Sequence, residues 1–276
     1  MSTQTTTQRF SARVPEFLYR NNKVIFVESI VILVLVWSAT AHAFDLTDTI
    51  SSPGLVAASA YELLLSGDWI VHFSATIRRV AYGFVLTIVV GTVLGVSMGI
   101  SDFWEAALQD YVTIGLALPS LFAAVFAAMW FGISDVTPMV AGAAIAFPFL
   151  TQNVYEGVKN IDYRLLEMSS AFGVSRRRVV WRVVFQSVLP QWFAGARYAF
   201  AICWKITTLA ELVAASNGIG YMIEFELNKF SLTGVLTWTL LFTILMVFIE
   251  YGVFQQIEKR VFAWRESAQI GLMGAA

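Results

Sequence analysis

The sequence is short of cysteine, histidine and charge. Of its 276 residues, one is cysteine, two are histidine and 13% are charged, about half the charged share of soluble domains. The single Cys203 excludes an internal disulfide, and two histidines are too few for a Cys/His metal centre. The low charge argues against a disordered chain, a nucleic-acid-binding arm and an ordinary soluble enzyme.

The chain also lacks the residues that bind nucleotide phosphates or perform catalysis. No Gly-rich stretch is followed by Lys-Ser/Thr, so no GxxxxGK[ST] phosphate loop is present. No serine, cysteine or carboxylate pair is placed with a histidine as a catalytic site requires. We therefore expect no enzymatic activity, no catalytic residue, no metal and no cofactor in this chain. Active transport would take its energy from another polypeptide.

What the sequence does contain is hydrophobic residues, at 58% of the total, with a mean hydropathy of +0.69. They form runs of roughly 20 residues, the length at which a helix crosses about 30 Å of hydrocarbon. We predict an all-α polytopic membrane protein with six transmembrane helices. The first run is longer than the 7–15 apolar residues of a signal peptide, which favours an uncleaved anchor. The predicted spans are 24–44, about 72–100, about 107–131, about 135–158, about 191–213 and about 233–257.

The distribution of lysine and arginine predicts the orientation. With the N-terminus inside, thirteen basic residues fall on the cytoplasmic side, and Arg78, Arg79 and Lys229 fall outside. Both termini are therefore expected in the cytoplasm. The predicted organisation is a cytoplasmic tail 1–23, a permease domain 24–262 and a cytoplasmic tail 263–276. Residues 54–66 are expected to form a short helix at the outer interface.

A long basic cytoplasmic loop over about 159–190 is the most informative segment. We predict a helix over 161–172, then Gly173 at a position that needs positive φ. A second helix is expected from Ser175, as its cap, to Leu189-Pro190. Two interpretations remain open: a protruding element that contacts a partner, or a solvated loop that only sets topology.

The spacing within this loop resembles a known motif. Glu167 precedes Gly173 by six residues, and Pro190 follows Gly173 by 17, which resembles the EAA loop of bacterial ATP-binding-cassette (ABC) importer permeases. Further segments resemble the nitrate/sulfonate/taurine class of that family, in the expected order, over about 25–262. The family usually has Glu-Ala-Ala where this chain has Glu167-Met168-Ser169. It usually has Leu-Pro, 13 residues after the glycine, where this chain has Phe185-Gln186. The missing proline predicts a straighter helix from Ser175 to Leu189. The segments are 50–55, 74–80, 91–99, 130–133, 147–148 and 210–221.

The resemblance implies a type I ABC importer permease of the MetI-like fold in the cell inner membrane. It implies a permease dimer, expected as a homodimer, with two cytoplasmic ATPases that bind ATP and Mg, and a periplasmic or lipid-anchored binding protein. Membrane lipid is an expected partner and nucleic acid is not. Glu167 pairing only with Arg164 is an alternative to ATPase contact. The coupling residues implied are Arg164, Glu167, Met168, Ala171, Phe172, Gly173, Ser175, Arg176, Arg177 and Pro190.

Ionisable residues within the fifth run mark a candidate translocation path, because charges in a span usually face a cavity or a partner. We assign Trp204, Lys205, Thr208 and Glu211 to that path. Lys205 pairing with a carboxylate elsewhere is the structural alternative, and its six-residue separation from Glu211 places the two on nearly opposite helix faces. Arg197 is expected to extend toward the cytoplasmic interface.

The resemblance suggests a small anion as substrate, such as nitrate, a sulfonate or taurine, or bicarbonate. An aromatic or pyrimidine nutrient is the alternative within the same class. A self-contained secondary transporter is the alternative from another class, but it predicts an inverted repeat, and none is clear between 24–131 and 135–257. Pro119 and Pro148 are expected to kink their helices. Glycines 83, 91, 95 and 99 are expected to allow close helix packing.

Overall fold

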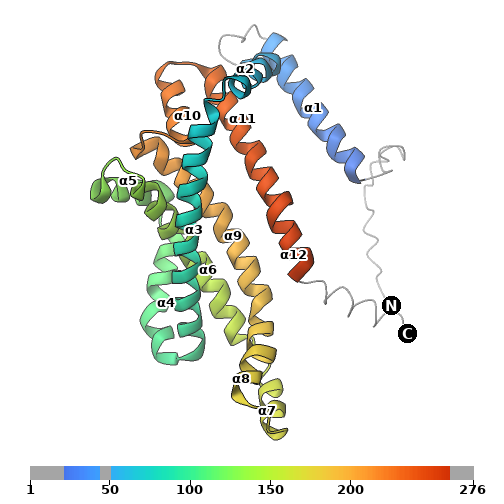
Figure 1. The fold of residues 1–276 in the computed structure, drawn as a ribbon, viewed down its shortest axis with the longest axis vertical. Helices are drawn as coiled ribbons and strands as arrows, with labels where there is room; N and C mark the ends of the chain where they lie inside the picture. Colours follow the sequence, from blue (N-terminus) through green and yellow to red (C-terminus); the bar gives the residue numbers. More distant parts are fainter. Residues whose placement is uncertain (1–21, 44–50, 262–276) are drawn as a thin grey trace, which may run out of the picture. The chain divides into compact units, whose positions relative to one another are not determined.

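The computed structural model describes residues 22–43 and 51–261, and every regular element in those ranges is helical. The predicted tails 1–23 and 263–276 lie outside the described residues, except for Asn22 and Lys23 at the start of the first helix. The described residues up to Ser59 and those from Ala60 onward form two compact units. The elements (Figure 1) are α1 Asn22–Ala43, α2 Pro53–Ser66, α3 Trp69–Ile100, α4 Asp102–Ala117, α5 Ser120–Phe131, α6 Val136–Lys159, α7 Tyr163–Ala171, α8 Arg176–Val179, η2 Val180–Val184, α9 Phe185–Ala214, α10 Ile219–Asn228, α11 Leu232–Ile249, η3 Glu250–Phe254 and α12 Gln255–Val261.

The larger unit is organised around α6, which packs along α3 on one side and α9 on the other. The glycines of α3 face α6, as expected. A Cβ added at Gly95 would lie 2.6 Å from the carbonyl oxygen of Thr151, and one at Gly99 would lie 2.5 Å from Val158. Only glycine permits so close an approach of two helices, which brings many backbone atoms into van der Waals contact.

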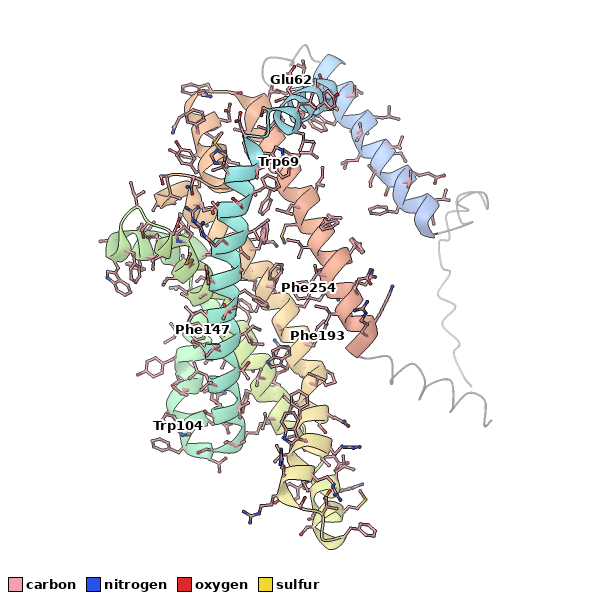
Figure 2. All side chains as sticks on the ribbon, viewed as in Figure 1. Glu62, Trp69, Trp104, Phe147, Phe193 and Phe254 are labelled. Carbon is pink, nitrogen blue, oxygen red and sulfur yellow. The ribbon has the colours of Figure 1, made fainter. Side chains whose placement is uncertain are left out.

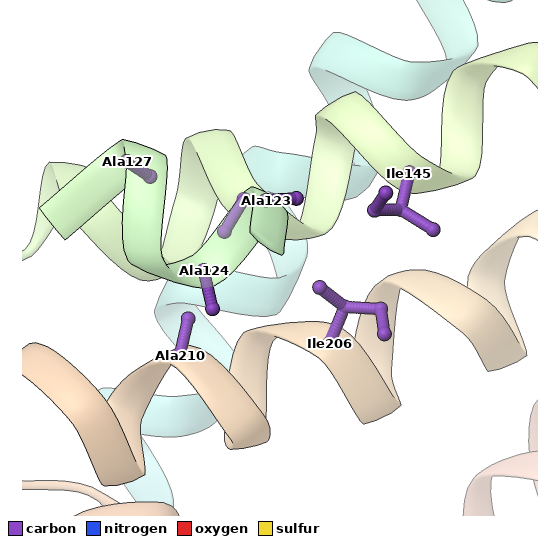
Figure 3. Packing of buried hydrophobic residues seen from close by; sticks show 7 residues of the cluster. Ala123, Ala124, Ala127, Ile145, Ile206 and Ala210 are labelled. Atoms are coloured by element: carbon purple, nitrogen blue, oxygen red, sulfur yellow. The ribbon is translucent and has the colours of Figure 1, made fainter. Parts of the chain in front are cut away.

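Small apolar side chains also join α5, α6 and α9 (Figure 3). Ala123 and Ala124 of α5 are buried against Ile145 of α6 and against Ile206 and Ala210 of α9. A second cluster of aromatic residues joins α9 to the last helices. The rings of Phe193 and Phe254 lie 6.5 Å apart, and Figure 2 shows them on facing helices. The unit is therefore held mainly by close packing.

The third predicted span is not one continuous helix. α4 ends at Ala117, α5 begins at Ser120, and the two axes differ by 102°. Pro119 lacks the N–H that would continue the helix, and its ring forces Leu118 into an extended conformation, with ψ of 124°. The bend at Pro119 that the sequence predicts is confirmed, and the crossing of the membrane by 107–131 as one bent span stays a prediction. Pro148, in contrast, lies within an unbroken α6.

Not all six predicted runs meet the requirements of a membrane-crossing helix by length and composition. Among the described residues three single helices do so, Val24–Ala41, Trp69–Ile100 and Leu232–Arg260, and the bent pairs α4–α5 and α9–α10 raise the total to five. α6, the fourth predicted run, is not among them. Its surroundings are α3, α5 and α9, so its polar residues Thr137 and Thr151 are buried in protein. The six-span count remains a prediction.

Candidate functional site

The loop between α6 and α9 forms a helical projection, which we call the foot (residues 160–184), at one end of the larger unit (Figure 1). Its first helix, α7, is capped by Asp162, whose carboxylate accepts a hydrogen bond from the backbone N–H of Arg164 at 2.9 Å. The helix ends at Ala171, and Gly173, two residues further on, has φ of +63°. The prediction of positive φ at this glycine is confirmed.

The backbone around Gly173 forms a Schellman motif. The N–H of Gly173 donates to the carbonyl of Ser170, and the N–H of Val174 donates to that of Ser169, both at 3.0 Å. These bonds satisfy carbonyls that the end of α7 leaves free. The chain reversal between the two foot helices is therefore fixed by hydrogen bonds and does not depend on a partner.

The second foot helix differs from the prediction in three respects. Ser175 precedes α8, but its side chain makes no capping hydrogen bond. The helix does not end at Leu189-Pro190, because α8, η2 and α9 run without a break from Arg176 to Ala214 and Pro190 lies inside α9. It is also not regular, since Val180–Val184 is a π-helical turn. A π turn inserts one extra residue and often marks a functional position.

The charged side chains of the foot are exposed and form no ion pairs with one another. Glu167, Arg164, Ala171, Arg176 and Arg177 are all exposed. Arg164 and Glu167 form no ion pair in the described part of the chain, so the local pair considered from the sequence is not formed there. Phe172 is 79% exposed and Met168 is 51% exposed. The foot thus presents free charges beside apolar side chains, the composition of a surface that binds a protein partner.

An ion-pair cluster anchors the base of the foot. Lys159, the last residue of α6, binds Glu105 of α4 at 2.6 Å and lies 3.6 Å from Asp102. The hydroxyl of Tyr155 donates to Glu105 at 2.6 Å. Both carboxylates lie in the first turn of α4, where the helix dipole favours negative charge. The cluster fixes the end of α6 from which the foot projects.

The residues assigned to the translocation path lie on α9 in different environments. Lys205 is exposed and has no ion-pair partner within the described ranges. Trp204 is buried between Phe200 and Phe242, and its indole N–H has no hydrogen-bond partner in the described structure. The hydroxyl of Thr208 donates to the carbonyl of Trp204 at 3.1 Å. Of the four, Lys205 is exposed and the other three are buried.

Glu211 lies in a buried ionic network at the end of the unit opposite the foot. Its carboxylate accepts a hydrogen bond from Arg79 of α3 at 2.8 Å, and both side chains are at most 1% exposed. The second carboxylate oxygen accepts from the hydroxyl of Thr76 at 2.8 Å and from the backbone N–H of Gly220 at 3.1 Å. Thr76 in turn accepts from the N–H of Ile219.

The guanidinium of Arg79 is fully satisfied. Its five N–H groups, the full number in arginine, make hydrogen bonds to Glu211, to Asp135 and to the backbone and side chain of Asn217. Asp135, just before α6, also pairs with Arg78 at 2.8 Å. The network therefore ties α3, the start of α6, the end of α9 and the loop before α10 together.

Sequence reasoning missed this network. It counted Arg78 and Arg79 as outer charges and gave no role to Asp135 or Asn217. The available signal was an arginine within an apolar run, since such a residue needs a partner. The partner itself could not be read from the sequence, because Glu211 lies 132 residues further along the chain.

A cleft of about 910 Å³ lies between α9 and the last helices, on the side of the foot. Arg197 of α9 points across it to Glu250 and Glu258, and the contact with Glu258 is 2.8 Å. Glu250 belongs to the π-helical turn η3. The extension of Arg197 toward the cytoplasmic interface stays a prediction, and the structure gives this side chain two carboxylate partners that hold α9 against η3 and α12.

The comparisons with known proteins agree with this architecture. The chain is 26% identical over 238 residues to a Bacillus subtilis protein named as the aliphatic sulfonates transport permease SsuC, covering 86% of each chain. It is 23% identical to the taurine transport system permease TauC of Escherichia coli, covering 72% of each. It is also 23% identical to the formylaminopyrimidine transport permease ThiX of Halalkalibacterium halodurans, covering 85% of this chain and 93% of that one.

Solved structures share the fold. An inward-facing structure of the MetNI methionine ABC transporter matches 72% of this chain and 96% of that chain, with a TM-score of 0.60 and 20% identity. A family model described as "Binding-protein-dependent transport system inner membrane component" matches residues 87–263. Because this match covers more than half of the sequence, the chain belongs to that family: it is a MetI-like inner-membrane permease of the ABC importers, a transport subunit and not an enzyme.

Proposed function

We propose that two copies of this chain form the transmembrane pathway of an ATP-driven importer, and that each copy couples to a separate ATPase through its foot. The observation that carries this proposal is the foot itself. Its backbone is closed by hydrogen bonds at Gly173, whereas its charged and aromatic side chains are exposed. A rigid projection with free side chains is organised to dock into another protein.

The foot offers a partner two kinds of contact, charged and apolar. Glu167, Arg176 and Arg177 supply charge-assisted hydrogen bonds, and Met168 and Phe172 supply apolar area for a pocket. ATP and Mg bind to the partner ATPase.

Continuity of the helix supports a mechanical role for the foot. From Arg176 the chain remains helical to Ala214, so the second helix of the foot is continuous with the segment that carries Lys205. When the ATPases close on ATP, a displacement of the foot moves α9 and alters access to the pathway between its two sides. The π turn at Val180–Val184 is the position where α9 and the foot adjust to each other.

The proposed substrate is a small anion, a sulfonate such as taurine first among candidates. Lys205 is an exposed cation on α9 without an internal partner in the described ranges, and two of the relatives named above are sulfonate and taurine permeases. The formylaminopyrimidine permease relative favours a pyrimidine nutrient as the second candidate. Nitrate and bicarbonate are further anions to test.

The proposed orientation places the foot and both termini in the cytoplasm. Single cysteines at Ser175 and at Asn228 test it, since the two residues lie at opposite ends of the larger unit. A membrane-impermeant thiol reagent added to intact cells should label Asn228→Cys only, and inverted vesicles should expose Ser175→Cys only. The native Cys203 is buried and serves as the background control. Labelling of Ser175→Cys from outside would overturn the orientation.

The decisive experiment is purification of the chain with its candidate ATPase, followed by reconstitution in vesicles with a binding protein. Uptake of radiolabelled taurine should require ATP, the ATPase and the binding protein together. Uptake that proceeds without an ATPase would instead support a secondary transporter. Formylaminopyrimidine and nitrate, each with its own binding protein, distinguish the substrate candidates in the same assay.

A further inference from the structure

The cleft between α9 and the last helices continues the helix face that carries Lys205. Arg197 and Ala201 of α9 line the cleft, beside Phe193, which Figure 2 labels. Lys205 follows Ala201 by four residues, so it lies one turn further along the same face. Arg197 and Lys205 are therefore two cations on one face of α9, about 12 Å apart along the helix axis. Because the proposed function assigns Lys205 to the substrate, the cleft lies next to the substrate's path, on the side of the foot.

Arg197 binds two carboxylates across this cleft. Its Nε donates to Glu250 and its Nη1 donates to Glu258, both at 2.8 Å, and its Nη2 donates to Glu250 as well. The exposed fractions of the three side chains lie between 36% and 44%, against at most 1% for Arg79 and Glu211. Ion pairs that keep contact with water exchange partners at little cost, whereas buried pairs do not. The ion pairs of the cleft are thus open to a competing ligand.

A π-helical turn brings the two carboxylates to the same side of the last helix. Glu250 begins η3 and Glu258 lies in α12. In a regular α-helix, residues eight apart point about 80° away from each other. The residue that a π turn inserts gives these two the spacing of residues seven apart, which lie on one face. The turn therefore allows one guanidinium to bind both groups, and a return of η3 to α-helical geometry would turn Glu258 away from Arg197.

The charges of the cleft favour one class of ligand. Its lining contains two positive side chains and two negative ones, so it is neutral as a whole: Arg197, Lys259, Glu250 and Glu258. A plain anion would add an uncompensated charge beside two carboxylates, which costs free energy where water is partly excluded. A zwitterion adds no net charge, and it replaces each internal ion pair with one of its own. A sulfonate also offers the paired oxygen acceptors that suit the planar guanidinium.

We propose that the cleft is a binding site for a zwitterionic solute of the taurine class, a short chain with a sulfonate at one end and an ammonium at the other. Arg197 binds the sulfonate, and Glu250 or Glu258, released from Arg197, binds the ammonium. The inference rests on the proposed function and narrows its substrate from small anions in general to zwitterions. Between transport events the internal ion pairs occupy the same groups and hold α9 against η3 and α12.

The test measures how fast a cysteine in the cleft reacts. Ala201→Cys is introduced into the full-length permease in lipid nanodiscs and alkylated with a small neutral thiol reagent. The native Cys203 is buried and gives the background rate. Saturating taurine should slow the alkylation by about fivefold or more. Ethanesulfonate, which lacks the ammonium, and ethylamine, which lacks the sulfonate, should each slow it by less than about twofold.

Two variants in the Ala201→Cys background separate ligand binding from a purely structural role. Glu250→Gln/Glu258→Gln keeps the cation of Arg197, so ethanesulfonate should then protect the cysteine as well as taurine does. Arg197→Gln/Glu250→Gln/Glu258→Gln keeps hydrogen-bonding groups without their charges. This triple variant should melt close to the parent protein and lose protection by taurine. Arg260→Gln changes an exposed arginine of α12 outside the cleft lining and, as the matched control, should alter neither property.

Every outcome supports or overturns the site. No protection by taurine, or equal protection by ethanesulfonate in the unaltered cleft, would overturn it. A triple variant that is still protected would also overturn it, because Arg197 would then only hold helices together. If the triple variant fails to assemble, the double variant decides: an unchanged preference for taurine overturns the site, and loss of that preference supports it. Uptake in vesicles tests the proposed function separately, since ATP-dependent taurine uptake without protection in the cleft would overturn the site alone.

Discussion

The foot and the Arg79–Glu211 network contain the same kinds of side chain and use them in opposite ways. In the foot, Glu167 and Arg176 are exposed and do not form ion pairs within the described chain. In the network, Arg79 and Glu211 are at most 1% exposed and every N–H of the guanidinium is bonded. The difference is solvent access, which makes a charge inexpensive to leave free in the foot and costly to leave free in the network.

This comparison assigns each region a role. A region whose charges are all used internally fixes one arrangement of helices, and the network does this for α3, α6, α9 and the loop before α10. A region whose charges are free has side chains available for a partner, which is what the proposed coupling to an ATPase requires. Removing a charge should therefore reduce stability at one end of the molecule and coupling at the other.

The largest effect is expected from breaking the network. Arg79→Met leaves Glu211 buried without its cation and should destabilise the protein by about 3–5 kcal/mol. We expect low yield and a melting temperature, measured in detergent, lowered by roughly 10 °C or more. The double variant Arg79→Met/Glu211→Met removes both charges and should recover part of the loss. A single variant as stable as wild type would contradict the role given to the network.

How far sequence reasoning succeeded depends on the range of the interactions involved. The positive φ of Gly173 was predictable because a glycine between two amphipathic stretches is a local signal. The Arg79–Glu211 pair was not, because it depends on packing between segments 132 residues apart. The candidate translocation residues were found on one helix, but their different burial is set by α3 and α11, which helix periodicity does not reveal.

The prolines illustrate the same limit. Pro119 separates two helices whereas Pro190 lies within one, although both follow a leucine. Residues before Pro190 such as Gln186 are exposed, so a carbonyl that loses its helical partner there can bond to solvent. The fold class and the position of the foot could be read from apolar runs and motif spacing. The positions at which helices break could be determined only from their three-dimensional surroundings.

The next effect in size concerns the foot. Gly173→Val places a β-branched residue at φ of +63° and should cost about 1–2 kcal/mol locally. Nothing lies within 4 Å of a Cβ at this position, so the loss comes from the backbone alone. We expect normal membrane insertion but loss of ATPase from the purified complex. Gly173→Asn, which tolerates this conformation better, is the control and should retain more ATPase.

Reversing a single foot charge should leave stability unaffected. Glu167→Lys changes an exposed residue without an ion pair in the described chain. The free energy of unfolding should therefore change by no more than about 0.5 kcal/mol, as for other surface substitutions, and the melting temperature should stay close to that of wild type. The affinity for the ATPase should fall because a charge-assisted contact becomes repulsive. The affinity is measured by titrating ATPase onto permease in nanodiscs. An unchanged affinity would mean that Glu167 lies outside the contact surface.

The smallest effect on stability, and the sharpest test of the substrate class, is expected for Lys205. Lys205→Met retains much of the length and apolar character of the side chain and removes the charge and its donors. Because Lys205 is exposed and has no carboxylate partner in the described chain, the complex should assemble and melt like wild type. Taurine uptake in vesicles should fall, while Lys205→Arg keeps a cation at the position and should retain more of the uptake.

If Lys205 instead pairs with a carboxylate of a second copy, Lys205→Met leaves that group uncompensated and the dimer should lose stability. Full uptake with normal stability would remove the residue-level support for an anionic substrate and leave the pyrimidine candidate as the stronger one.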